Sequence, residues 1–426
     1  MTSESTALPG SPPAPVPRVR HPLTLPHFRN LWIGVTISLL GDQFYLLALP
    51  WLALQLTGSS LMLGTILMTA AIPRAALMLV GGAVTDRFSA RRVLTTTAAV
   101  RAVLVGAVAF LIWRDLIQVW QLYALTFAFG VADAFSFPAG SALIPTLVRP
   151  EQLQPANALF QSSTVLTQLA GPLPAGLLIK TWGVASALFF DALSFLAVIA
   201  ALFRIPEPPS QAPAVSEGAE APARPSMLHS IAEGLRSVRN DPPLMSLMAI
   251  FAAINFCVSG PIGVGLASLA KFRFGSEVAF GTLLSSFSAG TLAGIVAGGT
   301  VKRPRRRGLQ FIVMSLLCGL ELIGIGLVPK AYGLGVIAAL LAVMGLGVGF
   351  VNVQFSSWMQ MRVERALLGR VMSVLMFAAV GLVPVSLALS GVLAQWSLGG
   401  LFIAAGAVLV VASVACLSGK AAREID

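Results

Sequence analysis

The sequence predicts an all-α membrane protein whose twelve transmembrane helices form two pseudo-symmetric six-helix bundles. Of its 426 residues, 56% are hydrophobic and only 11% are charged. The mean hydropathy of +0.85 exceeds that of soluble globular domains. Stretches of about 20 apolar residues, long enough to cross a bilayer as a helix, recur along the chain. Weak internal similarity relates the first half of these stretches to the second.

Twelve apolar stretches reach the length of a membrane-spanning helix. A β-barrel is excluded, because barrel strands alternate in polarity and are about half as long. The predicted spans are residues 31-55, 61-84, 92-113, 118-142, 155-179, 184-204, 244-269, 278-301, 309-328, 332-358, 369-394 and 397-418.

The distribution of positive charge orients these spans. A net charge of +11 is by itself also compatible with nucleic-acid binding. If both termini are cytoplasmic, 21 of the 28 Lys and Arg residues lie on cytoplasmic segments, five on outer loops and two inside spans. This asymmetry is the positive-inside rule. We therefore expect a multi-pass protein of the cytoplasmic (inner) membrane with cytoplasmic N- and C-termini, in contact with lipid and with no nucleic-acid partner.

Polar segments divide the chain further. The N-terminal segment is rich in Pro and polar residues, so we expect a disordered tail there and not a signal peptide. Between the sixth and seventh spans, a Pro-, Ala- and Glu-rich stretch cannot bury a core. It leads into a predicted amphipathic helix with Leu228, Ile231 and Leu235 at helical spacing. The predicted parts are an N-terminal tail (1-28), a six-helix bundle (29-204), a cytoplasmic linker (205-243), a second six-helix bundle (244-418) and a C-terminal tail (419-426).

The two halves resemble each other at a fixed offset. Shifted by 217 residues, "GTILMTAAIPRAALMLVGGAV" (64-84) lies over "GTLLSSFSAGTLAGIVAGGTV" (281-301), and Gly130 falls on Gly347. At an offset of 210, "GPLP" in span five falls on "GLVP" in span eleven. Two parallel six-span repeats are typical of transporters that bind their substrate at the interface between the halves.

A charged loop between spans two and three carries a known pattern. "GGAVTDRFSARRVL" (81-94) has a Gly, an Asp-Arg pair four and five positions later, and a basic cluster. It resembles the loop motif of the major facilitator superfamily, with Ser89 in place of the second Gly and Ala90 where many members have Arg. Longer stretches such as "FRNLWIGVTISLLGDQFYLLALPWL" resemble the macrolide-efflux and enterobactin-exporter branch of that superfamily. The residues that match the loop motif are Gly82, Asp86, Arg87, Arg91 and Arg92.

This resemblance implies a gate and a direction of transport. Family members use the loop as a cytoplasmic gate, so Asp86 is expected to engage a helix N-terminus or Arg370 when the transporter is open outward. The echo in the second half, "GGTVKRPRRRGL", has no acid and is interpreted as an orienting basic loop. "GPLPAG" (171-176) partly resembles the antiporter motif, with Ala175 where Gly is usual. This favours export.

Ionisable residues inside spans are expected to be functional, because burying them in a bilayer is costly unless they are paired or hydrated. By distance from the nearest turn, Asp42 and Arg74 lie at the same mid-membrane depth in neighbouring helices. Asp191 and Glu321 lie about 10 Å from the outer surface at 1.5 Å per residue, where snorkelling or solvation explains them. The candidates for proton coupling are Asp42, Arg74, Arg101 and Asp133.

The second half of the internal repeat lacks these charges. At the 217-residue offset, Asp42 falls on Ser259 and Arg74 falls on Thr291. This argues against a purely architectural need, although a single ion pair that stabilises the first half gives the same pattern. We expect Asp42, paired with Arg74, to bind a proton from outside and release it inside while cargo moves outward.

The cargo cavity is expected to be lined by polar and aromatic residues at helical spacing on several spans, which suits amphipathic organic molecules better than inorganic ions. The same residues also serve as helix-packing contacts. The candidates are Ser38, Tyr45, Phe135, Phe137, Gln161, Gln168, Asn255, Ser259, Asn352, Ser356 and Trp358.

Together these features predict a secondary active transporter of the efflux-antiporter type. Its cargo is expected to be a drug, macrolide or siderophore, exported by alternating access and driven by protons, and the protein is expected to act as a monomer without a cofactor. Uptake, lipid flipping, or a receptor or assembly role on the same scaffold remain alternatives. An enzyme is not expected, because the three His residues lie outside the spans and no metal or catalytic triad spacing occurs.

Overall fold

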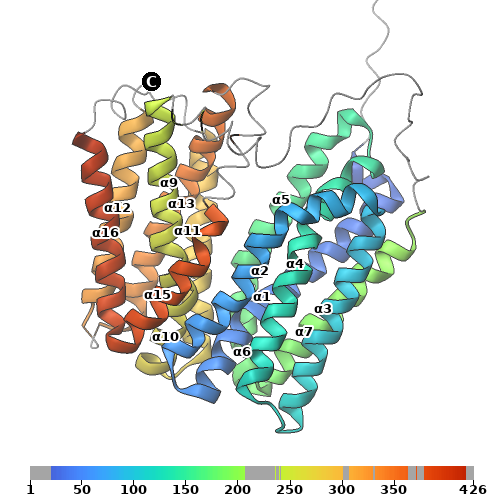
Figure 1. Ribbon diagram of the computed structural model, residues 1–426, viewed down its shortest axis with the longest axis horizontal. Helices are drawn as coiled ribbons and strands as arrows, with labels where there is room; N and C mark the ends of the chain where they lie inside the picture. The colour runs from blue at the N-terminus through green and yellow to red at the C-terminus, as the bar shows by residue number, and fades with distance from the viewer. Residues whose placement is uncertain are drawn as a thin grey trace, which may run out of the picture.

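The computed structural model describes residues 21–206, 236, 239, 241–300, 307–329, 332–362, 371 and 379–418, without the side chains of residues 79–83, 85–87, 307, 360 and 418. The described part is helical and contains no strand. Two helical bundles stand side by side, one built from the blue-to-green half of the chain and one from the yellow-to-red half (Figure 1). The predicted fold class is confirmed.

The first bundle contains the helices that correspond to spans one to six. Their bounds are α1 Pro26–Thr57, α2 Ser60–Arg87, α3 Ala90–Trp113, α4 Val119–Leu147, α5 Leu153–Ala170, α6 Pro172–Trp182 and α7 Val184–Phe203. The second bundle contains α9 Pro242–Gly260, α10 Leu266–Leu269, α11 Glu277–Thr300, α12 Arg307–Leu327, α13 Gly333–Arg362, α15 Val383–Trp396 and α16 Leu398–Ser418.

Eleven helices of the described part are long and apolar enough to cross a membrane. The fifth predicted span is not among them, because it is divided into α5 and α6 at Gly171. Pro172 lacks a backbone N–H and its ring crowds the preceding turn, so a proline here interrupts the helix. Gly171 keeps right-handed helical dihedrals, with φ −79° and ψ −46°, so the chain continues in nearly the same direction. The predicted count of twelve spans therefore agrees with the structure if α5 and α6 count as one.

The seventh span is longer than predicted. It runs from Pro242 to Phe274, not from 244 to 269, because two π-helical turns (Pro261–Gly265 and Ala270–Phe274) flank α10 and continue the helix. It ends at Gly275, whose φ of 61° is a left-handed value that glycine adopts without strain.

The two ends of the molecule differ. We call the end at which α1 begins and α16 finishes the terminal end, and the end with the turns at Gly58, Gly183 and Gly275 the distal end. The bundles pack against each other through α2 with α15 and through α6 with α11. Near the distal end, the Ser60 hydroxyl donates to Ser268 across the halves at 2.8 Å. The described contacts between bundles thus join their distal parts, and the ribbons diverge toward the terminal end (Figure 1).

These interbundle contacts repeat the internal similarity of the sequence. A Cβ atom on Gly64 of α2 would lie 2.8 Å from the Cα of Gly391 on α15. Gly281, the residue 217 positions after Gly64, has the equivalent place on α11, where it abuts the backbone of Pro172 on α6. The glycines at both crossings allow two backbones to approach closely. The offset of 217 residues therefore reports a real pseudo-symmetry.

Several predicted features lie wholly or largely outside the described residues. They are the N-terminal tail (1-28, of which 21–28 are described), most of the linker (205-243), the basic loop of 302-307, Arg370 and the C-terminal tail (419-426).

Candidate functional site: an ion-pair chain lining a membrane cavity

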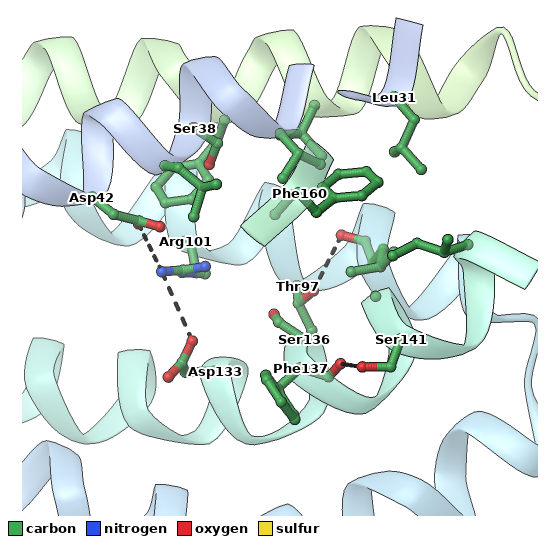
Figure 2. A pocket seen from close by; sticks show the side chains of 18 of the residues that line it. Leu31, Ser38, Asp42, Thr97, Arg101, Asp133, Ser136, Phe137, Ser141 and Phe160 are labelled. Carbon is green, nitrogen blue, oxygen red and sulfur yellow. Dashed lines mark hydrogen bonds and ion pairs between the residues drawn. The ribbon is translucent and has the colours of Figure 1, made fainter. Parts of the chain in front are cut away.

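A cavity of about 330 Å³ lies inside the first bundle, between α1, α2, α3, α4, α5 and α7. Its walls are largely apolar, from Leu31 near the terminal end of α1 to Phe195 in the middle of α7. Figure 2 shows Leu31, Phe137 and Phe160 around it. Hydroxyl groups of Ser38, Thr97 and Ser136 interrupt this apolar wall. Four charged side chains line its deep part, in the middle of the helices: Asp42, Arg74, Arg101 and Asp133.

The four charged residues form one continuous chain of ion pairs. Arg101 Nη2 lies 2.9 Å from Asp42 Oδ1 and 3.9 Å from Asp133 Oδ1. Arg74 Nε lies 3.1 Å from Asp133 Oδ2 and continues the chain. Figure 2 shows Arg101 between the two carboxylates, which come from α1 and α4. The two acids and two arginines neutralise each other, which makes their presence in the membrane interior tolerable.

Arg101 occupies the centre of this chain and is held by two aromatic rings. Its guanidinium carbon lies 4.3 Å from the ring centroid of Phe129 on α4 and 4.7 Å from that of Phe195 on α7. Its side chain is 12% exposed. Stacking of a guanidinium on aromatic faces is favourable and strengthens when water is excluded. Arg101 is therefore fixed by three helices other than its own, through Asp42, Phe129 and Phe195.

The pairing differs from the one predicted by depth. Asp42 was expected to pair with Arg74, but it pairs with Arg101, and Arg74 pairs with Asp133. The reason is lateral packing: α2 packs along α4, whereas α1 and α3 both pack along α7. Helices adjacent in sequence and equal in depth are therefore not the closest neighbours in the bundle.

Only some of the predicted cavity residues line this cavity. Ser38 and Phe137 do so. Tyr45 is buried and borders a second, apolar cavity of about 100 Å³ between the bundles. Phe135 lies in a separate groove with residues of α3 and α4. The side chains of Gln161 and Gln168 are exposed and are not among the residues that line this cavity.

The predicted residues of the second bundle lie elsewhere. The Asn255 amide donates to the carbonyl of Phe251 in its own helix. Trp358 is buried in the core at 3% exposure. Ser259 and Ser356 are partly buried, and Asn352 is exposed. The sequence predicted a cavity shared by both halves, whereas the cavity described above is formed by the first bundle.

The loop motif is only partly described. The side chains of Asp86 and Arg87 and the contacts of Gly82 and Arg370 lie outside the described residues. Arg91 donates its Nε hydrogen to the carbonyl of Leu202 at 2.8 Å and so links α3 to the end of α7. The Arg92 side chain is exposed. The predicted gate therefore stays a prediction.

One residue was placed wrongly by sequence reasoning. Asp191 was expected near the surface, solvated or snorkelling, but its exposure is 0%. It faces α1, where a Cβ atom on Gly41 would lie 2.8 Å from its Oδ1. Distance along the chain from a turn measures depth in the membrane and not which neighbour a side chain faces. Glycine beside Asp42 was the sequence signal for this close approach.

Replacing Arg74 by Gln is expected to change the free energy of unfolding by no more than about 1 kcal/mol, because ion pairs of exposed side chains contribute little. The Arg74 side chain is 54% exposed, and Arg101 still neutralises Asp133 in its absence. Thermal unfolding of the detergent-purified protein measures this change. A large loss of stability would show that the Arg74–Asp133 pair is a main structural contact.

The chain resembles known proteins over almost its whole length. The family model described as Major Facilitator Superfamily matches residues 31–385. Macrolide efflux protein A of Streptococcus pyogenes is 23% identical over 404 residues, covering 94% of this chain and 97% of that protein. Multidrug efflux pump Tap of Mycolicibacterium fortuitum is 27% identical over 428 residues, covering 96% and 98%.

Solved structures share the fold. The nucleoside transporter NupG superposes with a TM-score of 0.69 at 13% identity, covering 92% of this chain and 98% of that chain. A bacterial homologue of the iron transporter ferroportin, in an inward-facing state, gives a TM-score of 0.68 at 18% identity, covering 92% and 98%. At these identities the likeness concerns the fold alone.

Proposed function

The chain belongs to the major facilitator superfamily, a family of membrane transporters and not of enzymes, and from this premise we propose that it exports amphipathic organic molecules in exchange for protons. The relatives that cover almost the whole chain carry names of efflux proteins for macrolides and for multiple drugs. Export of such compounds from the cytoplasm across the inner membrane is the corresponding role for this protein, which we take to act as a monomer.

The observation that carries this proposal is the combination of an apolar cavity and a charged chain at its deep end. A volume of about 330 Å³ lies at the lower end of the range for sites that bind drug-sized molecules. Apolar walls accept varied hydrophobic bodies with little specificity. Asp42 and Asp133 at the deep end attract a cationic group, and the arginines attract an anionic one. Such a site suits amphipathic cargo.

Alternating access supplies the transport cycle. The bundles, which we assign to residues 29-204 and 244-418, touch through their distal parts, and the cavity extends toward the terminal end, where Leu31 and Ile144 line it. We place the terminal end in the cytoplasm, because most Lys and Arg residues lie there. This geometry corresponds to an inward-open state from which cargo enters. Rocking of one bundle against the other then opens the distal side.

Protons enter this scheme through the carboxylates. When Asp42 is ionised, it accepts a charge-assisted hydrogen bond from Arg101 at 2.9 Å. Protonation removes that attraction and frees Arg101 to turn fully to Asp133, which lies 3.9 Å away. A proton and a cationic cargo then compete for the same carboxylates, so the binding of one favours release of the other. Competition of this kind is sufficient to couple their opposite flows.

The test is protection of a pump-deficient bacterial host that expresses the protein, using a panel of macrolides, cationic dyes and siderophores. We expect lower accumulation of at least one amphipathic class, and an uncoupler should abolish this effect. Asp42→Asn should abolish it too, whereas Asp115→Asn, at an exposed turn, serves as the matched control. Uncoupler-sensitive efflux that persists in Asp42→Asn at normal expression would contradict the role of Asp42. An absence of efflux for every compound would favour uptake, lipid flipping or a receptor role.

A further inference from the structure

Asp191 is a fully buried carboxyl group that the ion-pair chain does not include. It lies on α7, one helical turn from Phe195, which lines the cavity and stacks on Arg101. Its exposure is 0%, and it sits against the backbone of α1 at Gly41, beside Asp42. Asp191 therefore lies next to the ion-pair chain but is not among the residues that line the cavity.

The hydrogen-bonding groups around Asp191 are incompletely satisfied. Within the described residues, its Oδ2 has no hydrogen-bond partner, and its Oδ1 receives only a long contact of 3.5 Å from the Ser194 hydroxyl. The Tyr45 hydroxyl and the Arg101 Nε are likewise buried without a partner. An ionised carboxylate in such surroundings is very unfavourable, because it has lost water and gained no ion-pair contact with a described residue.

The charge balance of the region also indicates that one carboxyl group is protonated. Asp191 faces α1, which contributes Asp42 and Tyr45, and α3, which contributes Arg101, and it interacts electrostatically with both Asp42 and Arg101. The remaining helix packed against α7 is α6, whose single ionisable residue, Lys180, is exposed. With Asp133 and Arg74 included, the cluster has three carboxyl groups and two guanidinium groups. It is neutral only if one carboxyl group carries a proton.

We propose that Asp191 is the second proton-binding site of the transporter and that Arg101 moves between Asp42 and Asp191 as this site empties and fills. This inference rests on the proposed proton-coupled function. In the observed state the proton is bonded to Asp191, and Arg101 pairs with Asp42. When the proton leaves, the Asp191 carboxylate accepts a hydrogen bond from Arg101, whose buried Nε–H has no acceptor among the described residues. Asp42 is then free to bind cationic cargo.

A proton fits this site better than a metal cation. Gly41 packs so closely that a Cβ atom there would be 2.8 Å from Asp191 Oδ1 and closer still to the Ser194 hydroxyl. Alkaline-earth cations need about six or more oxygen ligands. In the described part of the chain, no three His, Cys, Asp or Glu side chains are placed to hold a metal ion. The close packing and the lack of further ligands both favour a proton on the carboxyl group over a metal ion.

Infrared difference spectroscopy of the purified protein tests this proposal independently of transport. The wild type should show the carboxylic-acid C=O stretching band of a buried, protonated Asp, shifted in D2O, and Asp191→Asn should lose it. Asp115→Asn is the matched control, because Asp115 is an exposed carboxyl group at the turn that follows α3. It should leave the band unchanged. If Asp191→Asn keeps the whole band, Asp191 is not the protonated group.

Transport assays in proteoliposomes distinguish a failure of the proposed role of Asp191 from a failure of the proposed proton coupling. Asp191→Asn should lose accumulation driven by a pH gradient but retain cargo-for-cargo exchange without a gradient. If the wild type shows no pH-driven transport while the band assigned to Asp191 is present, the proposed proton coupling fails and the protonated site stands. If the wild type is pH-driven and Asp191→Asn is equally so, or if a sodium gradient replaces the proton gradient, the proposed role of Asp191 is overturned.

Discussion

Replacing Arg101 by Met is expected to abolish transport and to lower the free energy of unfolding by about 3 kcal/mol, the lower part of the range for breaking a buried ion pair. Met fills much of the same volume but leaves Asp42 without its partner at 2.9 Å. The substitution also removes the stacking on Phe129 and Phe195. Thermal unfolding in detergent and efflux from the expressing host measure the two effects.

A double variant distinguishes the effect of this ion pair on stability from its effect on transport. In Asp42→Asn/Arg101→Met, the buried carboxylate and the buried guanidinium are both removed, so much of the lost stability should return. Transport should not return, because the carboxylate proposed to bind cargo and the arginine proposed to move beside it are both absent. Arg101→Lys keeps the charge but loses the planar stacking, and it should be intermediate in both assays. If the double variant transports normally, the Asp42–Arg101 pair has only a structural role.

The contrast between the arginines shows what the sequence could and could not predict. Hydropathy alone places Arg74 and Arg101 in the membrane interior, and the cost of burial makes both notable. Their environments differ, because the Arg74 side chain is 54% exposed and that of Arg101 is 12% exposed. This difference depends on which helices pack side by side, and the linear order of spans does not contain that information. The two rings that hold Arg101 come from α4 and α7, far apart in the sequence.

Polar residues outside the first bundle illustrate a second limit. Asn255 has helical spacing suited to a cavity, but its amide group donates a hydrogen bond to the carbonyl of Phe251 one turn away. A polar side chain in a membrane helix lines a cavity or hydrogen-bonds within its own helix or to a neighbouring one, and the sequence spacing is the same in each case. The internal repeat predicted the structure better than the spacing of polar residues did. It preserves the glycine crossings in both halves and lacks the charges in the second, where Ser259 and Thr291 replace Asp42 and Arg74.

The two bundles share their helix crossings but differ in their charged residues. Both have the close-packed crossings that a rocking motion needs, as at Gly130 against Ala70 and at Gly349 against Thr291. In the described part of the chain, the most buried ion pair, Asp42–Arg101, lies in the first bundle, whereas the Asp241–Arg362 pair of the second lies near the terminal end and is partly exposed. In the proposed transport cycle, the first bundle would bind the charged substrates, and the second would provide the surface against which it moves.

Gly64→Leu is expected to prevent closure of the distal contact between the bundles. A Cβ atom on Gly64 would lie 2.7 Å from the carbonyl oxygen of Leu387 and 2.8 Å from the Cα of Gly391, both backbone atoms of α15. Overpacking of this kind costs about 1–3 kcal/mol. In a two-state transporter this shifts the equilibrium between open states by about 5- to 150-fold. The variant should populate the distal-open state and lose efflux while still folding.

Cysteine cross-linking reports this shift directly. The Ser59 hydroxyl donates to the side-chain oxygen of Gln395 at 3.0 Å across the distal contact. Ser59→Cys/Gln395→Cys, with the three native cysteines replaced by Ala, should therefore form an interbundle disulfide readily. Adding Gly64→Leu should slow its formation. Gly335→Leu is the matched control, because no atom lies within 4 Å of its Cβ position. Equal cross-linking in both variants would show that the α2–α15 crossing does not govern the distal opening.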